Sequence, residues 1–129
     1  MNSRVDILVV DDALAVRSRL VALFADVPGV GSILQAEGVR QAQELFQRHH
    51  PDVVVLDLNL RGESGLSLLH YFKRSRQDTL VIVLTNHSDS HHEKSCRRLG
   101  ADHFFDKSTQ FEAVLPVLAH QALQLNCSQ

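Results

Sequence analysis

Near its start the chain carries the stretch Val5-Asp6-Ile7-Leu8-Val9-Val10-Asp11-Asp12, an apolar run that stops at two adjacent aspartates. A second run of the same kind, Val53-Val54-Val55-Leu56, stops at Asp57. Aliphatic runs without polar alternation are typical of parallel strands that are covered on both faces. We therefore predict buried strands over 6–10 and 53–56 that bring three carboxylates to one edge of a sheet.

Three neighbouring carboxylates are costly to hold together. Two unit charges about 4 Å apart cost roughly 4 kcal/mol at an effective dielectric constant near 20. Proteins tolerate such a cluster when a cation sits in it or when one carboxyl keeps its proton. We interpret the three aspartates as a magnesium site that contains a reactive aspartate.

The bulk composition describes one ordinary globular domain. The chain has 129 residues, of which 44% are hydrophobic, and a formal net charge of −2, which gives no argument for a nucleic-acid or membrane partner. Cys96 and Cys127 lie far apart and form no disulfide framework, so a reduced, cytoplasmic setting is predicted. The first apolar run is too short for a signal-peptide core or a membrane span.

Further strands are expected over 32–36, 80–84 and 103–105, and the first of these is the weakest pattern and is expected at a sheet edge. Apolar residues at helical spacing predict a helix after each of the five strands. These residues are Val16, Leu20, Leu23 and Phe24; Ala42, Leu45 and Phe46; Leu66, Leu69 and Phe72 or Lys73; Cys96 and Leu99; and Phe111, Val114, Leu115, Leu118, Ala122 and Leu125.

Local signals predict where several of these helices begin and end. Pro28-Gly29 is expected to end the first helix, and Pro51 to stop the second. Ser90-His91-His92-Glu93 and Thr109-Gln110-Phe111-Glu112 have the spacing of capping boxes for the fourth and fifth helices. Pro116 falls inside the fifth helix and is expected to kink its first turns.

The resulting order is (βα) repeated five times, which predicts an α/β fold with a parallel sheet and right-handed crossovers. In such sheets ligands bind outside the carboxyl ends of the strands, at the point where the strand order reverses. Asp11, Asp12, Asp57, Thr85 and Lys107 all fall just past predicted strand ends. A functional site at this edge is therefore expected.

These features together resemble the receiver domain of two-component response regulators, in its stand-alone, chemotaxis-regulator-like form. The resemblance rests on Val10-Asp11-Asp12, Asp57-Leu58-Asn59-Leu60 with Gly65 downstream, Leu84-Thr85, Gly100-Ala101-Asp102 and Phe105-Asp106-Lys107. It implies a flavodoxin-like (βα)5 fold with a five-stranded parallel sheet in the order 2-1-3-4-5. We expect a single receiver domain over 1–129 with a polar tail from about residue 126.

The resemblance also implies a chemistry for the acid cluster. Asp57 would be the phosphoacceptor, taking a phosphoryl group from a sensor histidine kinase or a histidine phosphotransfer protein. Mg²⁺ (or Mn²⁺) would be held by Asp11, Asp12, Asp57 and the backbone carbonyl of Asn59, because magnesium prefers oxygen ligands. Lys107 and the hydroxyl of Thr85 would each bind a phosphoryl oxygen.

In the family, phosphorylation acts as a switch. Thr85 and Phe104 occupy the positions that change conformation, while Asn59 and His87 occupy positions that tune the loss of the phosphoryl group. The fourth helix, fifth strand and fifth helix would form the face that binds an unknown downstream protein. The domain would not be an enzyme on outside substrates, would not bind nucleic acid or membrane directly, and would be a monomer or a weak homodimer.

Three positions depart from the usual family pattern. Arg61 stands where proline is usual, which removes a source of loop rigidity, and Asn86 follows Thr85 where a smaller residue is commoner. Ser108 follows Lys107 where a proline with a cis bond is usual. We predict either a trans bond with an adjusted loop or a strained cis bond, since a non-proline cis bond costs about 3–4 kcal/mol.

Other interpretations remain open. The chain could be a pseudo-receiver that serves as an unphosphorylated scaffold, although the full acid set and Lys107 argue against this. An aspartate-nucleophile phosphatase often has a second acid where this chain has Asn59. A flavin-binding domain of the same fold would need a phosphate-binding loop where Asp11-Asp12 would repel phosphate.

Two polar groups near the fourth helix have both functional and ordinary interpretations. His87, His91 and His92 could hold a metal, but a polar helix start is the preferred interpretation. Lys94, Arg97 and Arg98 form a basic strip that is either a solvated face or a partner surface.

Overall fold

The computed structural model describes residues 4–127, with side chains described through residue 124. Its centre is a five-stranded parallel sheet in the order β2-β1-β3-β6-β7. These strands are β1 (Val5–Val10), β2 (Val30–Ala36), β3 (Val53–Leu56), β6 (Leu80–Thr85) and β7 (His103–Asp106). Counted along the chain, this is the predicted order 2-1-3-4-5, and the flavodoxin-like fold is confirmed. The weakest predicted strand does lie at an edge, although it begins two residues earlier, at Val30.

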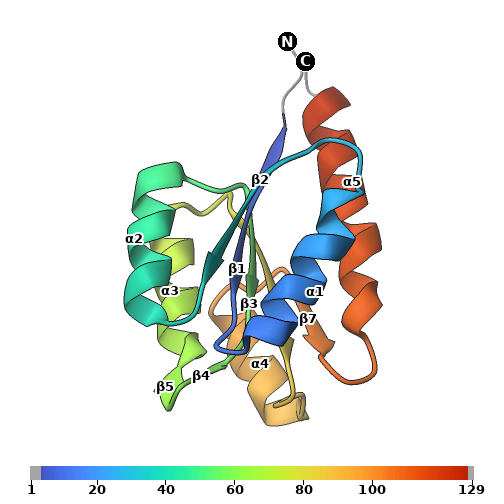
Figure 1. The fold of residues 1–129 in the computed structure, drawn as a ribbon. Helices are drawn as coiled ribbons and strands as arrows, with labels where there is room; N and C mark the ends of the chain where they lie inside the picture. The colour runs from blue at the N-terminus through green and yellow to red at the C-terminus, as the bar shows by residue number, and fades with distance from the viewer. Residues whose placement is uncertain (1–3, 128–129) are drawn as a thin grey trace.

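Helices cover both faces of the sheet (Figure 1). One face packs against α2 (Val39–His49), α3 (Gly65–Ser75) and α4 (Ser90–Arg98), and the other against α1 (Leu14–Ala25) and α5 (Val114–Cys127). Side chains therefore alternate between two buried layers along each strand. This explains why the strand sequences are apolar throughout.

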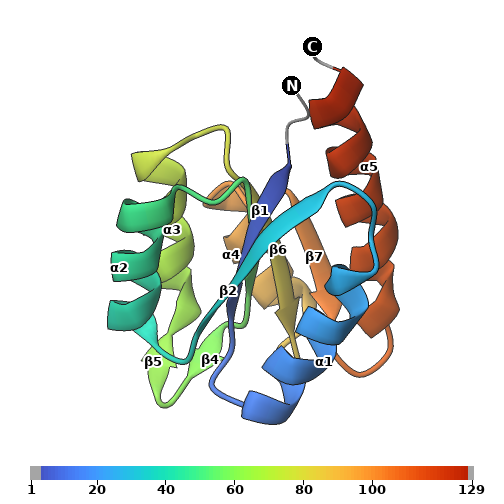
Figure 2. The ribbon, with the colours of Figure 1, turned by 45° about the horizontal axis from the view of Figure 1, so that its top comes forward.

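The carboxyl ends of the parallel strands meet at the edge of the sheet opposite the start of β1 and the end of α5 (Figures 1 and 2). The strand order reverses at β1, which pairs with β2 on one side and β3 on the other. The ends of β1 and β3 are thus adjacent, with Val10 opposite Leu56. The residues that follow these two strands necessarily face a common space.

Helix boundaries follow the predictions only in part. The first helix ends at Ala25, three residues before Pro28, whereas the second stops at His49, just before Pro51, as expected. Asp89, not Ser90, caps α4, because its Oδ1 accepts a hydrogen bond from the His92 N–H at 2.9 Å. The Ser90 capping box is therefore wrong.

The start of the fifth helix also differs from its prediction. A short 3₁₀ turn, η1 (Phe111–Ala113), precedes α5, and Gln110 at its start makes no side-chain cap. The predicted Thr109 capping box is thus wrong. Pro116 lies in the first turn of α5, where its missing N–H would have no intrahelical partner in any case. The helix runs from Val114 to Cys127, directly after the 3₁₀ turn, and the kink stays a prediction.

The helix α5 continues through Cys127, so it includes the first two residues of the predicted polar tail, and residues 128–129 lie outside the described part. The Lys107–Ser108 peptide bond is trans, the first of the two predicted alternatives. A small antiparallel hairpin of β4 (Asn59–Leu60) and β5 (Glu63–Ser64) has no counterpart in the predictions. Among the described residues, no helix combines the length and apolar character needed to cross a membrane.

Candidate metal centre at the carboxyl edge of the sheet

The three predicted aspartates come together where β1 and β3 end. Oxygen atoms from Asp11, Asp12 and Asp57 all lie within 4.8 Å of one another. Asp11 and Asp57 are buried, with 3% and 6% of their surface exposed, while Asp12 is half-buried. A backbone bond of 3.0 Å from the Asp57 N–H to the Val10 carbonyl joins the two strand ends. The donor set suits Mg²⁺, which prefers hard oxygen ligands.

Lys107 is the cation that the structure places among these acids. It follows β7, and its Nζ donates to Asp11 Oδ2 at 2.6 Å and to Asp57 Oδ2 at 3.0 Å. Burial alone favours the neutral amine, but the two carboxylates outweigh it and raise the pKa of Lys107. Three ionised carboxylates against one ammonium leave two negative charges uncompensated. A divalent cation matches this excess.

Asp11 is held firmly from several sides. Its Oδ1 accepts the Ala13 N–H at 2.9 Å, and its backbone carbonyl accepts a bond of 2.7 Å from the guanidinium of Arg17. The buried Arg17 also reaches Gln35 Oε1 on the neighbouring strand β2 at 3.2 Å. Burial raises the pKa of the Asp11 carboxyl, and the bonds from Lys107 and Ala13 offset part of this effect. Asp11 therefore has little freedom to move.

Arg17 is a site residue that our sequence predictions missed. It lies three and seven residues before Leu20 and Phe24, the buried apolar residues of α1, and so shares their face of the helix. A basic residue in register with an apolar stripe was the signal that could have found it.

Asp57 has the least restrained carboxylate oxygen of the two buried acids. Its Oδ2 accepts from Lys107. Among the described residues, its Oδ1 accepts only from the Asn59 N–H, at 3.4 Å, near the limit for a hydrogen bond. Asp12, by contrast, accepts a bond of 3.2 Å on Oδ2 from the backbone N–H of Arg61. A carboxylate oxygen that is buried yet weakly bonded can act as a nucleophile without first breaking strong contacts.

Arg61 forms the tip of the unexpected β4–β5 hairpin. Arg61 and Gly62 have φ angles of +53° and +83°, the two positive values that define a type I′ turn. The Arg61 guanidinium also pairs with Glu37, which follows β2, at 3.1 Å. The loop that we expected to lose rigidity without a proline is instead a tight hairpin tied to Asp12.

The remaining predicted residues lie around this centre. Thr85 is the last residue of β6, not a residue past its end, and its fully buried hydroxyl accepts the His87 N–H at 3.1 Å. Asn59 and His87 are both exposed and line one cavity of about 230 Å³. Phe104 is 8% exposed and packs into the core on the α2–α3–α4 side.

Among the described residues, the histidines near α4 do not come close enough together to form a group of three that could share an ion. His92 Nδ1 lies 2.8 Å from Asp89 Oδ2, and its ring is 5.5 Å from that of His87. Within residues 4–127, the acid trio is the one group of three or more His, Cys, Asp or Glu side chains close enough to share an ion. The interpretation as a polar helix start agrees with this geometry.

Residues 7–119 match the response regulator receiver domain family. The chain belongs to this family. Among curated proteins, the receiver is 32% identical over 103 residues to a protein-glutamate methylesterase/protein-glutamine glutaminase of Treponema pallidum, which covers 78% of the chain and 26% of that protein. The chain spans about half or less of the length of the first curated relatives that it matches.

Solved structures share the architecture of this receiver. A CheY-like response regulator receiver domain protein from Methanospirillum hungatei is 17% identical, with a TM-score of 0.85 and coverage of 98% and 100% of the two chains, and shows the fold alone. A response regulator from Burkholderia pseudomallei is 25% identical, with a TM-score of 0.76 and coverage of 96% and 72%. That structure carries a phosphorylated aspartic acid, a calcium ion and citrate.

Proposed function

We propose that this receiver domain accepts a phosphoryl group on Asp57 and passes the signal on by protein contact. The observation that carries the proposal is the buried Asp57 carboxylate, with one weakly bonded oxygen, beside two further acids and a lysine. The Burkholderia pseudomallei relative, with its phosphorylated aspartic acid and its calcium ion, supports the same chemistry.

The step is a transfer between two covalent carriers. A carboxylate oxygen of Asp57 attacks the phosphorus of a phosphohistidine on a kinase or phosphotransfer protein. The P–N bond breaks as the acyl phosphate forms, and the electron pair returns to the histidine nitrogen. Lys107 already contacts Asp57, so its ammonium is placed to bind an oxygen of the transferred phosphoryl group.

Asp11, Asp12, Asp57 and the Asn59 carbonyl would hold Mg²⁺ or Mn²⁺, which supplies positive charge to the phosphoryl oxygens. Thr85 would act in the switch by exchanging its bond from the His87 N–H for a bond that its hydroxyl donates to the phosphoryl group. Phe104 would repack in the same transition, and Asn59 and His87 would tune water access from the shared cavity. The phosphoryl group would shift the equilibrium between the inactive and active conformations, because it makes these contacts in only one of them.

The domain would thus act on itself and not on outside substrates. Its partners would be a histidine kinase or phosphotransfer protein and a downstream protein that binds the face formed by α4, β7 and α5. The cytoplasmic setting stays a prediction.

The proposal is tested by incubating the protein with a small-molecule phosphodonor and Mg²⁺ and measuring its intact mass. Wild type should gain one phosphoryl group, and Asp57→Ala should gain none. An unchanged mass for folded wild type would favour the pseudo-receiver scaffold. Steady release of phosphate from simple phosphoesters would favour the phosphatase.

A further inference from the structure

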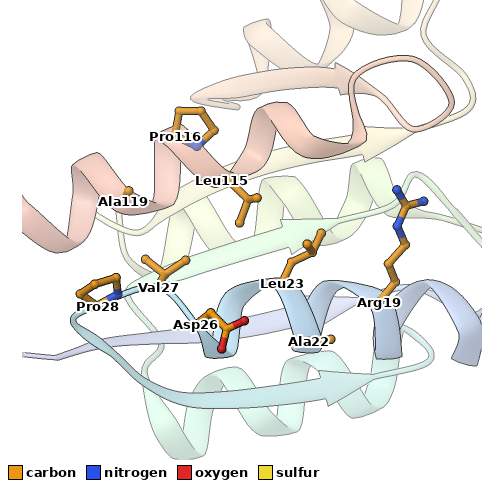
Figure 3. A pocket seen from close by; sticks show the side chains of 9 residues that line it. All are labelled: Arg19, Ala22, Leu23, Asp26, Val27, Pro28, Leu115, Pro116 and Ala119. Atoms are coloured by element: carbon orange, nitrogen blue, oxygen red, sulfur yellow. The ribbon is translucent and has the colours of Figure 1, made fainter.

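A groove between α1 and α5 is separate from the acid centre. It has a volume of about 620 Å³, and Leu23 and Leu115 point toward one another across it (Figure 3). Its lining comes from α1 with the turn after it and from α5. It is mostly apolar, with Ala22, Leu23, Leu115 and Ala119 beside the charged Arg19 and Asp26. None of these residues contributes to the phosphoacceptor site.

The apolar surface extends beyond the groove along α5. Leu123 lies one helical turn past Ala119, and 64% of its surface is exposed. Contiguous exposed apolar surface of this kind marks contact sites more often than isolated leucines do. The small side chains of Ala22 and Ala119 leave room for another helix to approach closely.

The charges beside the groove indicate which kind of partner could bind there. Arg19 and Asp26 lie seven residues, or about two turns, apart on the same side of α1. In an antiparallel pair of α1 helices related by a two-fold axis, Arg19 faces Asp26 of the second copy, and Ala22 faces Leu23. A partner of one charge sign would meet repulsion from one of the two residues. A second copy meets attraction from both.

The individual charges are arranged for such a contact. The Arg19 guanidinium lies 4.0 Å over the Phe111 ring, which fixes its position in advance. The Asp26 carboxylate has no hydrogen-bond or ion-pair partner among the described residues. It lies at the carboxyl end of α1, where the helix dipole disfavours a negative charge. Arg19 of a second copy would compensate the negative charge of Asp26.

We propose that the α1–α5 groove is the interface of a two-fold dimer of this chain. The α1 helices pack antiparallel, with Ala22 and Leu23 at the axis and two Arg19–Asp26 ion pairs at the rim. The dimer is weak and salt-sensitive because its rim pairs are solvent-exposed. It uses the side of α5 that lines the groove with α1.

The test is sedimentation velocity of the full unphosphorylated chain over a wide concentration range at low and high salt. Arg19→Glu and Asp26→Arg should each raise the dimer Kd by at least about tenfold, because each sets like charges opposite one another. The double variant Arg19→Glu/Asp26→Arg should return the Kd to near the wild-type value. Circular dichroism checks that each variant is folded.

The control variant is Arg98→Glu on α4, which should leave the Kd unchanged. A wild type that stays monomeric at every concentration overturns the proposal, as does a dimer that survives both single reversals. A dimer disrupted by Arg98→Glu would place the interface on α4 instead. If the double variant kept the raised Kd of the single variants, the antiparallel pairing would also be contradicted.

Discussion

Arg61 replaces the proline that receiver domains usually carry, and its backbone does what a proline cannot. Proline is confined to φ near −65° and has no N–H, whereas Arg61 has φ +53° and donates to Asp12. The other two departures also have partners: the Ser108 hydroxyl donates to Asn86 Oδ1 at 3.1 Å, joining two loops beside the acids. These contacts join the loops around the acid cluster.

Restoring the usual proline at this position should harm the metal site. Arg61→Pro removes the bond to Asp12 and forces the turn out of its conformation, which should weaken Mg²⁺ binding roughly tenfold and lower stability by about 1–3 kcal/mol. Arg61→Gly keeps the N–H and accepts positive φ, so its Mg²⁺ affinity should stay near that of wild type. Titration calorimetry and thermal melting measure both effects. Equal Mg²⁺ affinities for the two variants would show that the hairpin does not position Asp12.

At the level of single residues, the sequence predicted the meeting of Asp11, Asp12, Asp57 and Lys107, because each follows a strand of one parallel sheet. It predicted that Lys107 binds a phosphoryl oxygen, but not that Lys107 bonds to both Asp11 and Asp57, since the reach of a flexible side chain depends on tertiary packing. Arg17 was missed for the same reason.

The pairing of Lys107 with two buried acids predicts a stability that depends on metal. Lys107→Met leaves Asp11 and Asp57 without their cation, which should lower stability by roughly 3–5 kcal/mol in the absence of metal. Mg²⁺ should then bind more tightly than to wild type, because a competing positive charge is gone. Chemical denaturation with and without Mg²⁺ measures this, with exposed Lys94→Met as the control. Wild-type stability and Mg²⁺ affinity in Lys107→Met would contradict the role of Lys107 as counter-ion.

Among the elements, the long helices and buried strands were predictable from their periodicity, but short features were not. The β4–β5 hairpin has strands of two residues each, too short for any alternating pattern. Gly65, a residue of the family motif, begins α3 and packs against the backbone of the two residues that follow β3. An added Cβ would collide with the Asp57 carbonyl and lie 2.7 Å from Leu58 Cα. Close backbone approach thus requires glycine there, a constraint visible only in three dimensions.

The cap of α4 was misassigned because Asp89 and Ser90 are both good capping residues. Asp89 forms the cap, and its Oδ2 also lies within hydrogen-bond distance of the His92 Nδ1, at 2.8 Å. The bonds from the His92 backbone and ring lower the pKa of Asp89 below its usual 3.8. The stabilising effect of the Asp89 carboxylate is therefore complete above pH 3.8, the pKa of an unfolded aspartate. It is lost as the pH falls through the lower pKa of the folded state.

Asp89→Ala should thus lower the melting temperature at neutral pH, and the difference from wild type should shrink as the pH falls below about 3.8. Asp89→Asn, which keeps a capping oxygen, should retain most of the neutral-pH stability. Melting curves across the acid range measure both variants. A difference between wild type and Asp89→Ala that is constant with pH would show that the carboxylate charge plays no part.

At the scale of the whole molecule, the parallel sheet and its right-handed crossovers followed from the alternation of strands and helices. The strand order followed from the resemblance to receiver domains. The two core layers followed from strands that are apolar on both faces. The α1–α5 groove did not, because Leu23 and Leu115 both appear in the sequence as ordinary core positions. Their partial exposure depends on how far apart the two helices pack.

The central claim is that Asp57, and not one of its two acidic neighbours, receives the phosphoryl group. The protein is phosphorylated with a small-molecule donor and Mg²⁺ and reduced with borohydride, which converts an aspartyl phosphate to homoserine, and its peptides are then sequenced by mass spectrometry. The account predicts homoserine at position 57 and unmodified aspartate at positions 11 and 12. Homoserine at position 11 or 12, or at none of the three in a folded, magnesium-loaded protein, would contradict it.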